Sequence, residues 1–263
     1  MTMLKRLMLA TLCSVLLGAP PPALATDYSD IWGIIPAESG WGVNFDQNED
    51  VIFATFFVYG PSNQPTWLDA VMYRDGNGNF TGNLYTEVGP YYGAPWNPAA
   101  QSETLAGTAS FVPSDPYSGT LTYVLINGPT VVKSIQRSTL RTIVLGGNYV
   151  GGQTGAYSNC NNSGQNGAYT DTYTLGVTQA DSAATFTFNY ASGATCTMAG
   201  NLQQAGQLYR IDPASYSCTG SLMFNTSATM EEIKATTQGI EGRFTGSLSG
   251  GCQESAQFAG ALN

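Results

Sequence analysis

The chain has 263 residues, of which 43% are hydrophobic and only 10% are charged, and it contains no histidine. Nine basic and 18 acidic side chains give a net charge of −9, which repels nucleic acid and anionic membranes, so we expect no nucleic-acid partner. The lack of histidine excludes Ser-His-Asp and Cys-His catalysis and His-ligated metal centres. Phosphate-loop and dinucleotide-binding fingerprints are also missing, so we expect no cofactor.

The first 25 residues predict a secretory signal peptide. Lys5 and Arg6 form a short basic start, and the apolar run Leu7–Ala19 is shorter than the about 20 residues that span a bilayer. Ala23-Leu24-Ala25 has the small-x-small pattern of a cleavage site. We therefore expect a protein that is cleaved after Ala25 and exported to the periplasm or the medium. No later apolar run is long enough to predict a membrane span.

The first half of the remaining chain has the pattern of short strands. Segments of β-branched and aromatic residues recur between turn residues. Val51–Tyr59 is apolar on both faces, which indicates a central strand, and Asp75–Gly78 and Asn127-Gly128 predict tight hairpin turns. The expected strands are Trp41–Phe45, Val51–Tyr59, Trp67–Arg74, Phe80–Glu87, Leu105–Val112, Thr120–Ile126 and Val131–Arg137.

The second half continues in the same style. Thr229 and Glu232 form a capping pattern, so a short helix over Met230–Thr237 is an alternative to a strand there, although the β-branched residues favour the strand. The expected strands are Tyr149–Gly152, Thr172–Thr178, Thr185–Tyr190, Thr195–Asn201, Gln207–Ile211, Ser215–Gly220, Ile233–Thr236, Gly242–Leu248 and Ser255–Gly260.

A shift in composition predicts two β domains. The four tryptophans lie before residue 100, and the cysteines that remain after cleavage lie after residue 159. We place the boundary between Thr139 and Asn148, which gives a Trp-rich domain at 26–140 and a disulfide-bonded domain at 141–263. Phe53–Tyr59 resembles Ala184–Tyr190, which hints at related halves. Short, closely spaced strands predict an all-β antiparallel meander that forms a barrel or a sandwich.

Four cysteines remain in the exported chain, and an even number in such a chain predicts two disulfides. A structural metal site is disfavoured because there is no Cys-x-x-Cys pair and no histidine, so we expect no metal. Cys196 and Cys218 lie on strands that we expect to be neighbours. This favours a Cys196–Cys218 bond and leaves Cys160 to pair with Cys252.

Several motifs of the first half resemble a functionally unassigned family of β-rich modules in exported proteins of Gram-negative bacteria. They are Glu38–Phe45, Ile52–Phe57, Pro65–Leu68, Asn83–Tyr85 with Gly89-Pro90, and Lys133–Arg137. Together they cover most of Asp27–Ser138, and the second half resembles a cysteine-bearing domain found beside this module in some relatives. The resemblance implies export and a β fold, and it implies no catalytic residues.

Carboxylates are the remaining candidates for catalysis. Glu38, Asp69 and Glu87 are available for a glycosidase-type pair, and Asp69 lies within an apolar strand, where burial would raise its pKa. A partly wet strand face, or an ion pair with Arg74 or another basic residue, is the favoured explanation of Asp69. Two oxygen-rich patterns, Asp46-x-Asn48-x-Asp50 and Asp75-x-Asn77-x-Asn79, also suit calcium, but they suit hairpin turns better.

The most distinctive segment is the proline-stiffened loop Gly89–Pro98, which carries Tyr91, Tyr92 and Trp96. These flat side chains with polar tips either stack on a glycan or a small apolar ligand, or fill the open end of a barrel or cover an edge. Because aromatic side chains most often lie in a core, the second role is favoured for this loop. From these residues we expect an exported, non-enzymatic β protein, a binding or surface-interaction module. The alternatives are a carboxylate-dependent glycan hydrolase and a purely structural envelope protein.

Overall fold

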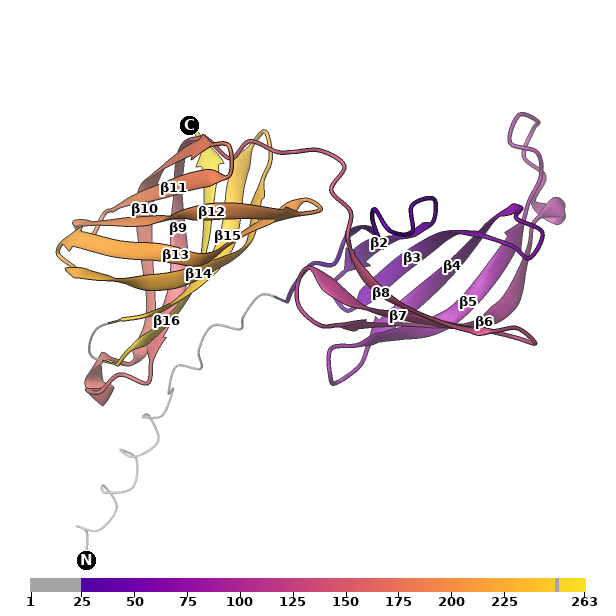
Figure 1. Ribbon diagram of the computed structural model, residues 1–263, viewed down its shortest axis with the longest axis horizontal. Helices are drawn as coiled ribbons and strands as arrows, with labels where there is room; N and C mark the ends of the chain where they lie inside the picture. The colour runs from indigo at the N-terminus through magenta and orange to yellow at the C-terminus, as the bar shows by residue number, and fades with distance from the viewer. Residues whose placement is uncertain (1–24, 249–250) are drawn as a thin grey trace, which may run out of the picture.

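The computed structural model describes residues 25–248 and 251–263, which form two closed antiparallel barrels of eight strands each (Figure 1). The predicted all-β fold is confirmed, and both halves are barrels and not sandwiches. Except for Ala25, the predicted signal peptide lies outside the described residues. Within the described residues, no helix is long and apolar enough to cross a membrane.

The first barrel is a meander in which each strand pairs with the next, and β1 closes the ring by pairing with β8. The sequence pattern missed β1 because it is only four residues long. The strands are β1 (Asp30–Gly33), β2 (Gly42–Asn48), β3 (Val51–Tyr59), β4 (Pro65–Arg74), β5 (Phe80–Val88), β6 (Ser102–Pro113), β7 (Ser118–Leu125) and β8 (Thr130–Arg137).

Alternate residues of these strands point inward and fill the first barrel. An eight-stranded barrel is just wide enough for side chains to occupy its interior. The indole of Trp32 is fully buried, and its Nε1 donates a hydrogen bond to the carbonyl oxygen of Tyr28 at 2.9 Å. The other large inward side chains are Phe45, Phe56, Met72, Phe80, Leu84, Phe111 and Leu121, each at most 2% exposed.

The second barrel is a longer meander that closes between β9 and β16. Its strands are β9 (Gly147–Ser158), β10 (Gly167–Ala180), β11 (Ala183–Tyr190), β12 (Ala194–Ala205), β13 (Leu208–Gly220), β14 (Phe224–Ala235), β15 (Gly239–Ser247) and β16 (Gln253–Leu262). Two short 3-10 turns, η1 (Pro98–Ala100) and η2 (Ser163–Gln165), lie in loops of the first and second barrels.

Two predicted elements of the second half differ from the structure. The helix alternative over Met230–Thr237 is wrong, because Met230 lies within β14 and pairs with both Ile211 and Phe244. The two short strands expected at Gln207–Ile211 and Ser215–Gly220 are one strand, β13. Pro213 lies between them where the register with β14 shifts, so the ladder is interrupted without ending the strand.

Both expected disulfides form. Cys196 and Cys218 face each other across β12 and β13, and both are buried. Cys160 and Cys252 join the segments that precede β10 and β16, across a sequence separation of 92 residues. Both disulfides lie at the end of the second barrel that carries the β9–β10 and β15–β16 connections, where β12 begins and β13 ends.

The similarity between Phe53–Tyr59 and Ala184–Tyr190 falls on β3 and β11, which are the third strands of their barrels. The matched positions nevertheless face opposite ways. Phe57 and Tyr59 are 56% and 59% exposed, whereas their matches Phe188 and Tyr190 are buried. A shift of one residue moves every side chain of a strand to the other face, so this similarity reflects strand composition and not equivalent packing.

A buried ion pair lies where the two barrels meet. Arg137 on β8 and Asp30 on β1 are 4% and 7% exposed, and Nη1 lies 3.1 Å from Oδ2. The same Oδ2 accepts a hydrogen bond at 3.0 Å from the backbone N–H of Gln207, in the β12–β13 turn of the second barrel. This shared carboxylate therefore fixes one barrel against the other.

A second contact crosses the junction beside this ion pair. The backbone N–H of Glu232 on β14 donates to the hydroxyl of Tyr117 at 2.9 Å, and the guanidinium of Arg210 lies 5.3 Å from the centre of the Tyr117 ring. Burial raises the pKa of Tyr117 to about 12. Tyr117 therefore stays neutral at physiological pH and serves as a packing and hydrogen-bonding group.

Candidate ligand-binding surface

The two ends of the first barrel have different surroundings. In a meander, alternate connections lie at the same end, so Asp30, Tyr117 and Arg137 lie together at the end that contacts the second barrel. The connections at residues 34–41, 60–64, 89–101 and 126–129 lie at the opposite end. Figure 1 shows the longest of them, between β5 and β6, projecting away from the second barrel.

The aromatic side chains of this loop are exposed. Tyr91, Tyr92 and Trp96 have 69%, 92% and 68% of their surface accessible, and the Tyr91 and Tyr92 ring centroids lie 5.0 Å apart. They therefore do not fill the open end of the barrel, which its own inward side chains occupy. The loop is ordered at its base, where the Asn97 side chain caps η1 and the Gln101 amide donates to Glu87 at 3.2 Å.

Exposed aromatic residues also cover the outer face of β3 and β4. Phe57 pairs with Trp67 and Phe53 pairs with Val71 across the two strands, so their side chains form a continuous surface. The expected central strand Val51–Tyr59 is β3, which is flanked by β2 and β4, but only one of its two apolar faces packs inside the barrel and the other faces solvent. We call this the aromatic face; its exposed members are Phe53, Phe57, Tyr59, Trp67, Val71 and Tyr73, between 40% and 61% accessible.

Large exposed apolar patches are uncommon on monomeric soluble proteins and usually mark interaction sites. The aromatic face also contains polar groups. Asp69 lies between Trp67 and Val71 along β4, opposite Thr55 on β3 and Tyr85 on β5. A surface that offers both flat apolar rings and hydrogen-bonding groups suits a ligand with the same two properties.

The environment of Asp69 raises its pKa. The first cause is its partial burial among the surrounding side chains, and the carboxylates of Glu87 and Glu103 on neighbouring strands add to it. The expected pairing with Arg74 does not occur: the Arg74 Nε lies 3.6 Å from Asp50 Oδ1. Arg74 is an odd number of residues from Asp69 along β4, so the two side chains point to opposite faces.

The other two carboxylates proposed for catalysis lie in different parts of the first barrel. Glu38 belongs to the loop before β2, where its Oε2 accepts from Lys133 Nζ at 2.7 Å and from Trp41 Nε1 at 3.0 Å. These hydrogen bonds lower the pKa of Glu38. Glu87 lies near enough to Asp69 to influence its titration, and so only these two share a surface.

The oxygen-rich patterns serve as turns. The Asp75 Oδ1 atom accepts hydrogen bonds at 2.8 Å from the backbone N–H groups of both Asn77 and Asn79. This is the local pattern by which aspartate stabilises a tight turn. In the first pattern, Asp50 is near Arg74. Among the described residues, no group of three or more His, Cys, Asp or Glu side chains is arranged to hold a metal ion.

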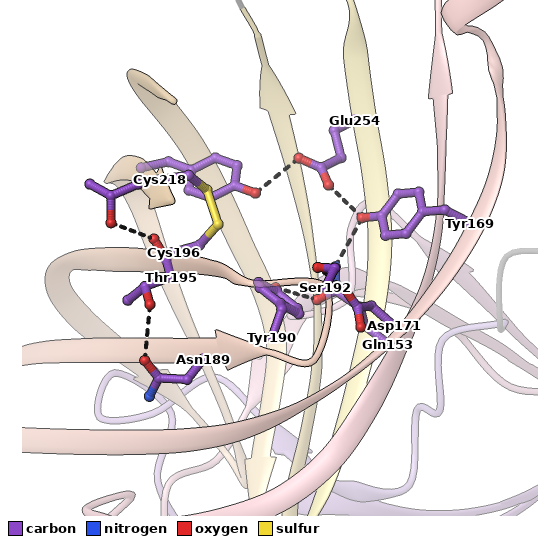
Figure 2. Close-up of a disulfide and its surroundings, with 12 residues drawn as sticks. Gln153, Tyr169, Asp171, Asn189, Tyr190, Ser192, Thr195, Cys196, Cys218 and Glu254 are labelled. Atoms are coloured by element: carbon purple, nitrogen blue, oxygen red, sulfur yellow. Dashed lines mark hydrogen bonds between the residues drawn. A yellow bond between two sulfur atoms is a disulfide. The ribbon is translucent and has the colours of Figure 1, made fainter. Parts of the chain in front are cut away.

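The sequence reading missed a polar cluster inside the second barrel. Glu254 is 3% exposed, and its carboxylate accepts hydrogen bonds from the hydroxyls of Tyr169 and Tyr216, the latter at 3.0 Å. Figure 2 shows Glu254 pointing toward Tyr169. Gln153 extends the cluster by bonding Tyr169 at 3.0 Å and Tyr190 at 2.6 Å.

A signal for this cluster was present in the sequence. Glu254 occupies the same alternating positions of β16 as Ala256 and Phe258, which are both buried. An acid in the inward phase of a strand predicts a buried carboxylate. The carboxylate lacks a cation among its hydrogen-bond partners, and burial raises its pKa.

In comparisons with known proteins, no protein-family model matches the chain and no curated sequence is significantly similar to it.

Proposed function

We propose that this protein is an exported, non-enzymatic binding module that holds a neutral glycan on the outer surface of its first barrel. The observation that carries the proposal is the aromatic face together with the exposed Tyr91, Tyr92 and Trp96 of the neighbouring loop. Flat rings stack on the apolar faces of sugars, and carboxylate and amide groups beside them bind hydroxyl groups.

Of the two ligand classes that the sequence suggested, the glycan is favoured. A small apolar ligand would need a dry cavity, and the interiors of small barrels offer one only when side chains leave it open. Here the inward positions of the first barrel hold large, fully buried residues such as Trp32, Phe56 and Phe111. A ligand of the first barrel is thus accommodated on its outer surface, where it must tolerate water.

The negative charge of the protein restricts the class of glycan further. Removal of residues 1–25 takes away Lys5 and Arg6 and leaves seven basic and 18 acidic side chains, a net charge of −11. Asp69, Glu87 and Glu103 lie close together beside the aromatic face. An anionic polysaccharide would be repelled, so the proposal is restricted to neutral glycans. Export is supported by the pattern of residues 1–25 and by the two disulfides, which persist in oxidising compartments.

The test is binding of soluble neutral glycans by isothermal titration, with the double variant Tyr92→Ala/Trp96→Ala and the single variant Trp67→Ala. Aromatic anchors of an interface often contribute about 2 kcal/mol or more, so we expect each to weaken binding at least about tenfold. Because these side chains are exposed, the melting temperature should hardly change. Met223→Ala, which truncates an 81% exposed side chain on the second barrel, is the matched control.

Four results would count against this proposal. Failure to bind any neutral glycan, or unchanged affinity in both aromatic variants, removes the surface as the site. Release of shortened products that stops in Asp69→Asn would instead identify a carboxylate-dependent hydrolase. Concentration-dependent self-association without glycan binding would favour a structural envelope protein.

A further inference from the structure

A cavity of about 500 Å³ lies where the segment before β1 passes the second barrel. Its walls carry four carboxylates and one guanidinium, although strands β9, β15 and β16 also contribute small and apolar residues. The charged lining residues are Asp27, Asp171, Glu232, Glu241 and Arg243. Ala25 also lines the cavity, so the predicted cleavage bond between Ala25 and Thr26 lies at its edge.

Side chains from both barrels hold the segment that follows this bond. The Thr26 hydroxyl donates to Glu232 Oε1 at 2.8 Å, on β14 of the second barrel. From the first barrel, the Gln47 side chain donates to the Thr26 carbonyl oxygen at 3.4 Å and accepts from the Tyr28 N–H at 2.8 Å. Arg137 donates to the carbonyl oxygen of Asp27. These contacts fix the position of Thr26, and Glu232 is the residue of the second barrel that Thr26 contacts.

The charges around Glu232 are not balanced. Arg243 is shared, with Nη2 at 2.8 Å from Glu232 and 3.4 Å from Glu231. Lys234 lies 4.0 Å from Asp27 and pairs across the strands with Glu241. Together with Asp171 on β10, the site holds five carboxylates and two cations among the groups named here. The Glu232 side chain is only 18% exposed, so water solvates it incompletely.

We propose that the α-ammonium group of Thr26, formed by cleavage after Ala25, binds the carboxylate of Glu232 and fastens the two barrels together. The proposal rests on the proposed export, because cleavage creates the group. Hydrolysis adds one water across the Ala25–Thr26 peptide bond and yields a carboxylate on Ala25 and an ammonium on Thr26. Before cleavage the Thr26 nitrogen is an uncharged amide; afterwards it supplies a cation that the cluster lacks.

The geometry of threonine keeps the nitrogen close to Glu232. Only Cα and Cβ separate the nitrogen from the hydroxyl oxygen that already touches Glu232. The backbone of Glu232 is itself fixed by the hydrogen bond from its N–H to the Tyr117 hydroxyl. The new ion pair would join residue 26 to β14, in parallel with the Asp30–Gln207 contact.

The experiment compares protein that begins with a free Thr26 amine with the same protein acetylated on that amine, each as wild type and as Glu232→Gln. At pH 7 we expect acetylation to lower the melting temperature of the wild type by about 2–4 °C, the shift that about 1 kcal/mol produces in a protein of this size. Acetylation should have no effect in Glu232→Gln. In the surface control Glu103→Gln, it should act as in the wild type.

The pH dependence of this stabilisation distinguishes an ion pair from a contact that does not involve the charge of the amine. A neighbouring carboxylate raises the pKa of an amine above its ordinary value of about 7.7–8.0. The stabilisation is then fully present below that ordinary value and is lost as the pH rises through the raised pKa. The free-amine protein should therefore approach the melting temperature of the acetylated protein between pH 7 and pH 10.

Equal melting temperatures of the free and acetylated proteins at pH 7, or an undiminished acetylation effect in Glu232→Gln, would overturn the proposal. If Glu232→Gln does not fold, NMR titration of the ¹⁵N-labelled Thr26 amine decides, and an ordinary pKa contradicts the ion pair. The intact mass of protein exported by its native host tests cleavage separately. A mass that does not begin at Thr26 would refute the proposed export, whatever the purified free-amine protein shows.

Discussion

At the scale of single residues, the buried ionisable groups of the two barrels have different kinds of partner. Arg137 in the first barrel is matched by Asp30 and three carbonyl oxygens, and its guanidinium lies 4.9 Å from the centre of the Trp32 ring. Glu254 in the second barrel is surrounded by tyrosines, which donate hydrogen bonds and carry no positive charge. Burying a charge is costly unless it is paired and hydrogen-bonded, so Glu254 should make stability depend on pH.

We predict how Glu254→Gln changes that dependence. Burial raises the pKa of Glu254, so the folded protein holds this proton to a higher pH than the unfolded chain does. The group's contribution is most favourable at acidic pH and is lost as the pH rises through the raised pKa. Glutamine has the same shape and does not ionise. The stability of the variant relative to wild type should therefore improve from pH 4 to pH 8 in chemical denaturation, and a constant difference would contradict this prediction.

At the scale of elements, the β12–β13 turn depends on one glycine to reach the first barrel. Gly206 has φ +61°, and a Cβ atom on it would lie only 2.1 Å from Asp30 Oδ2. The backbone of this turn thus approaches the carboxylate that Arg137 and Gln207 share. Hairpin turns usually require glycine only for its backbone freedom, but here close approach is a second requirement.

Gly206→Ala and Gly193→Ala separate these two requirements. Gly193 has φ +92° in the β11–β12 turn, and the nearest neighbour of an added Cβ is Ser221 Oγ at 4.0 Å. Both variants should lose about 1–2 kcal/mol from backbone strain. Gly206→Ala should lose more, because it also displaces Asp30 or the turn. Urea denaturation measures both losses, and equal values would show that the turn does not press against the ion pair.

At the scale of the whole molecule, the two barrels have the same number of strands but differ in the bonds that stabilise them. The second barrel has two disulfides, and the first has none among its described residues. The junction rests on the Asp30 carboxylate, on Tyr117 and on the segment that begins at Thr26. Because all four tryptophans precede residue 100, tryptophan fluorescence reports the first barrel alone.

We predict that Arg137→Met destabilises the first barrel and leaves the melting of the second nearly unchanged. Removing one partner of a buried pair leaves an uncompensated charge on Asp30, at a cost of about 3–5 kcal/mol. The fluorescence transition should move to lower temperature and separate from the remaining calorimetric transition. Reductant should lower only that remaining transition, since a disulfide contributes about 2–4 kcal/mol.

The control for this variant is Arg74→Met, which removes a partly exposed pair with Asp50. Exposed pairs contribute about 0–1 kcal/mol, so the fluorescence transition should move much less. A large shift in both variants, or a first barrel that melts unchanged without Arg137, would contradict the prediction that the buried pair stabilises the first barrel.

Much of the fold was readable from local patterns. Alternating hydrophobicity and turn residues located nearly all the strands, because a strand buried on one face imposes a period of two on its own sequence. The pairing of Cys196 with Cys218 followed from the same order of neighbouring strands. The four-residue β1 is too short for a period to be visible. The interruption at Pro213 resembled the end of a strand because proline is unusual inside a strand, and here it lies where the register between β13 and β14 shifts.

Tertiary structure alone decided the surfaces and the junction. Phe53, Phe57 and Trp67 have the composition of a core, and only closure of the ring placed them outside while Phe56 and Leu68 fill the interior. Arg137, Asp30 and Gln207 are far apart in the chain, and no local pattern relates them. A sequence records which side chains alternate; which of the two alternating faces meets water depends on the direction in which the sheet curves.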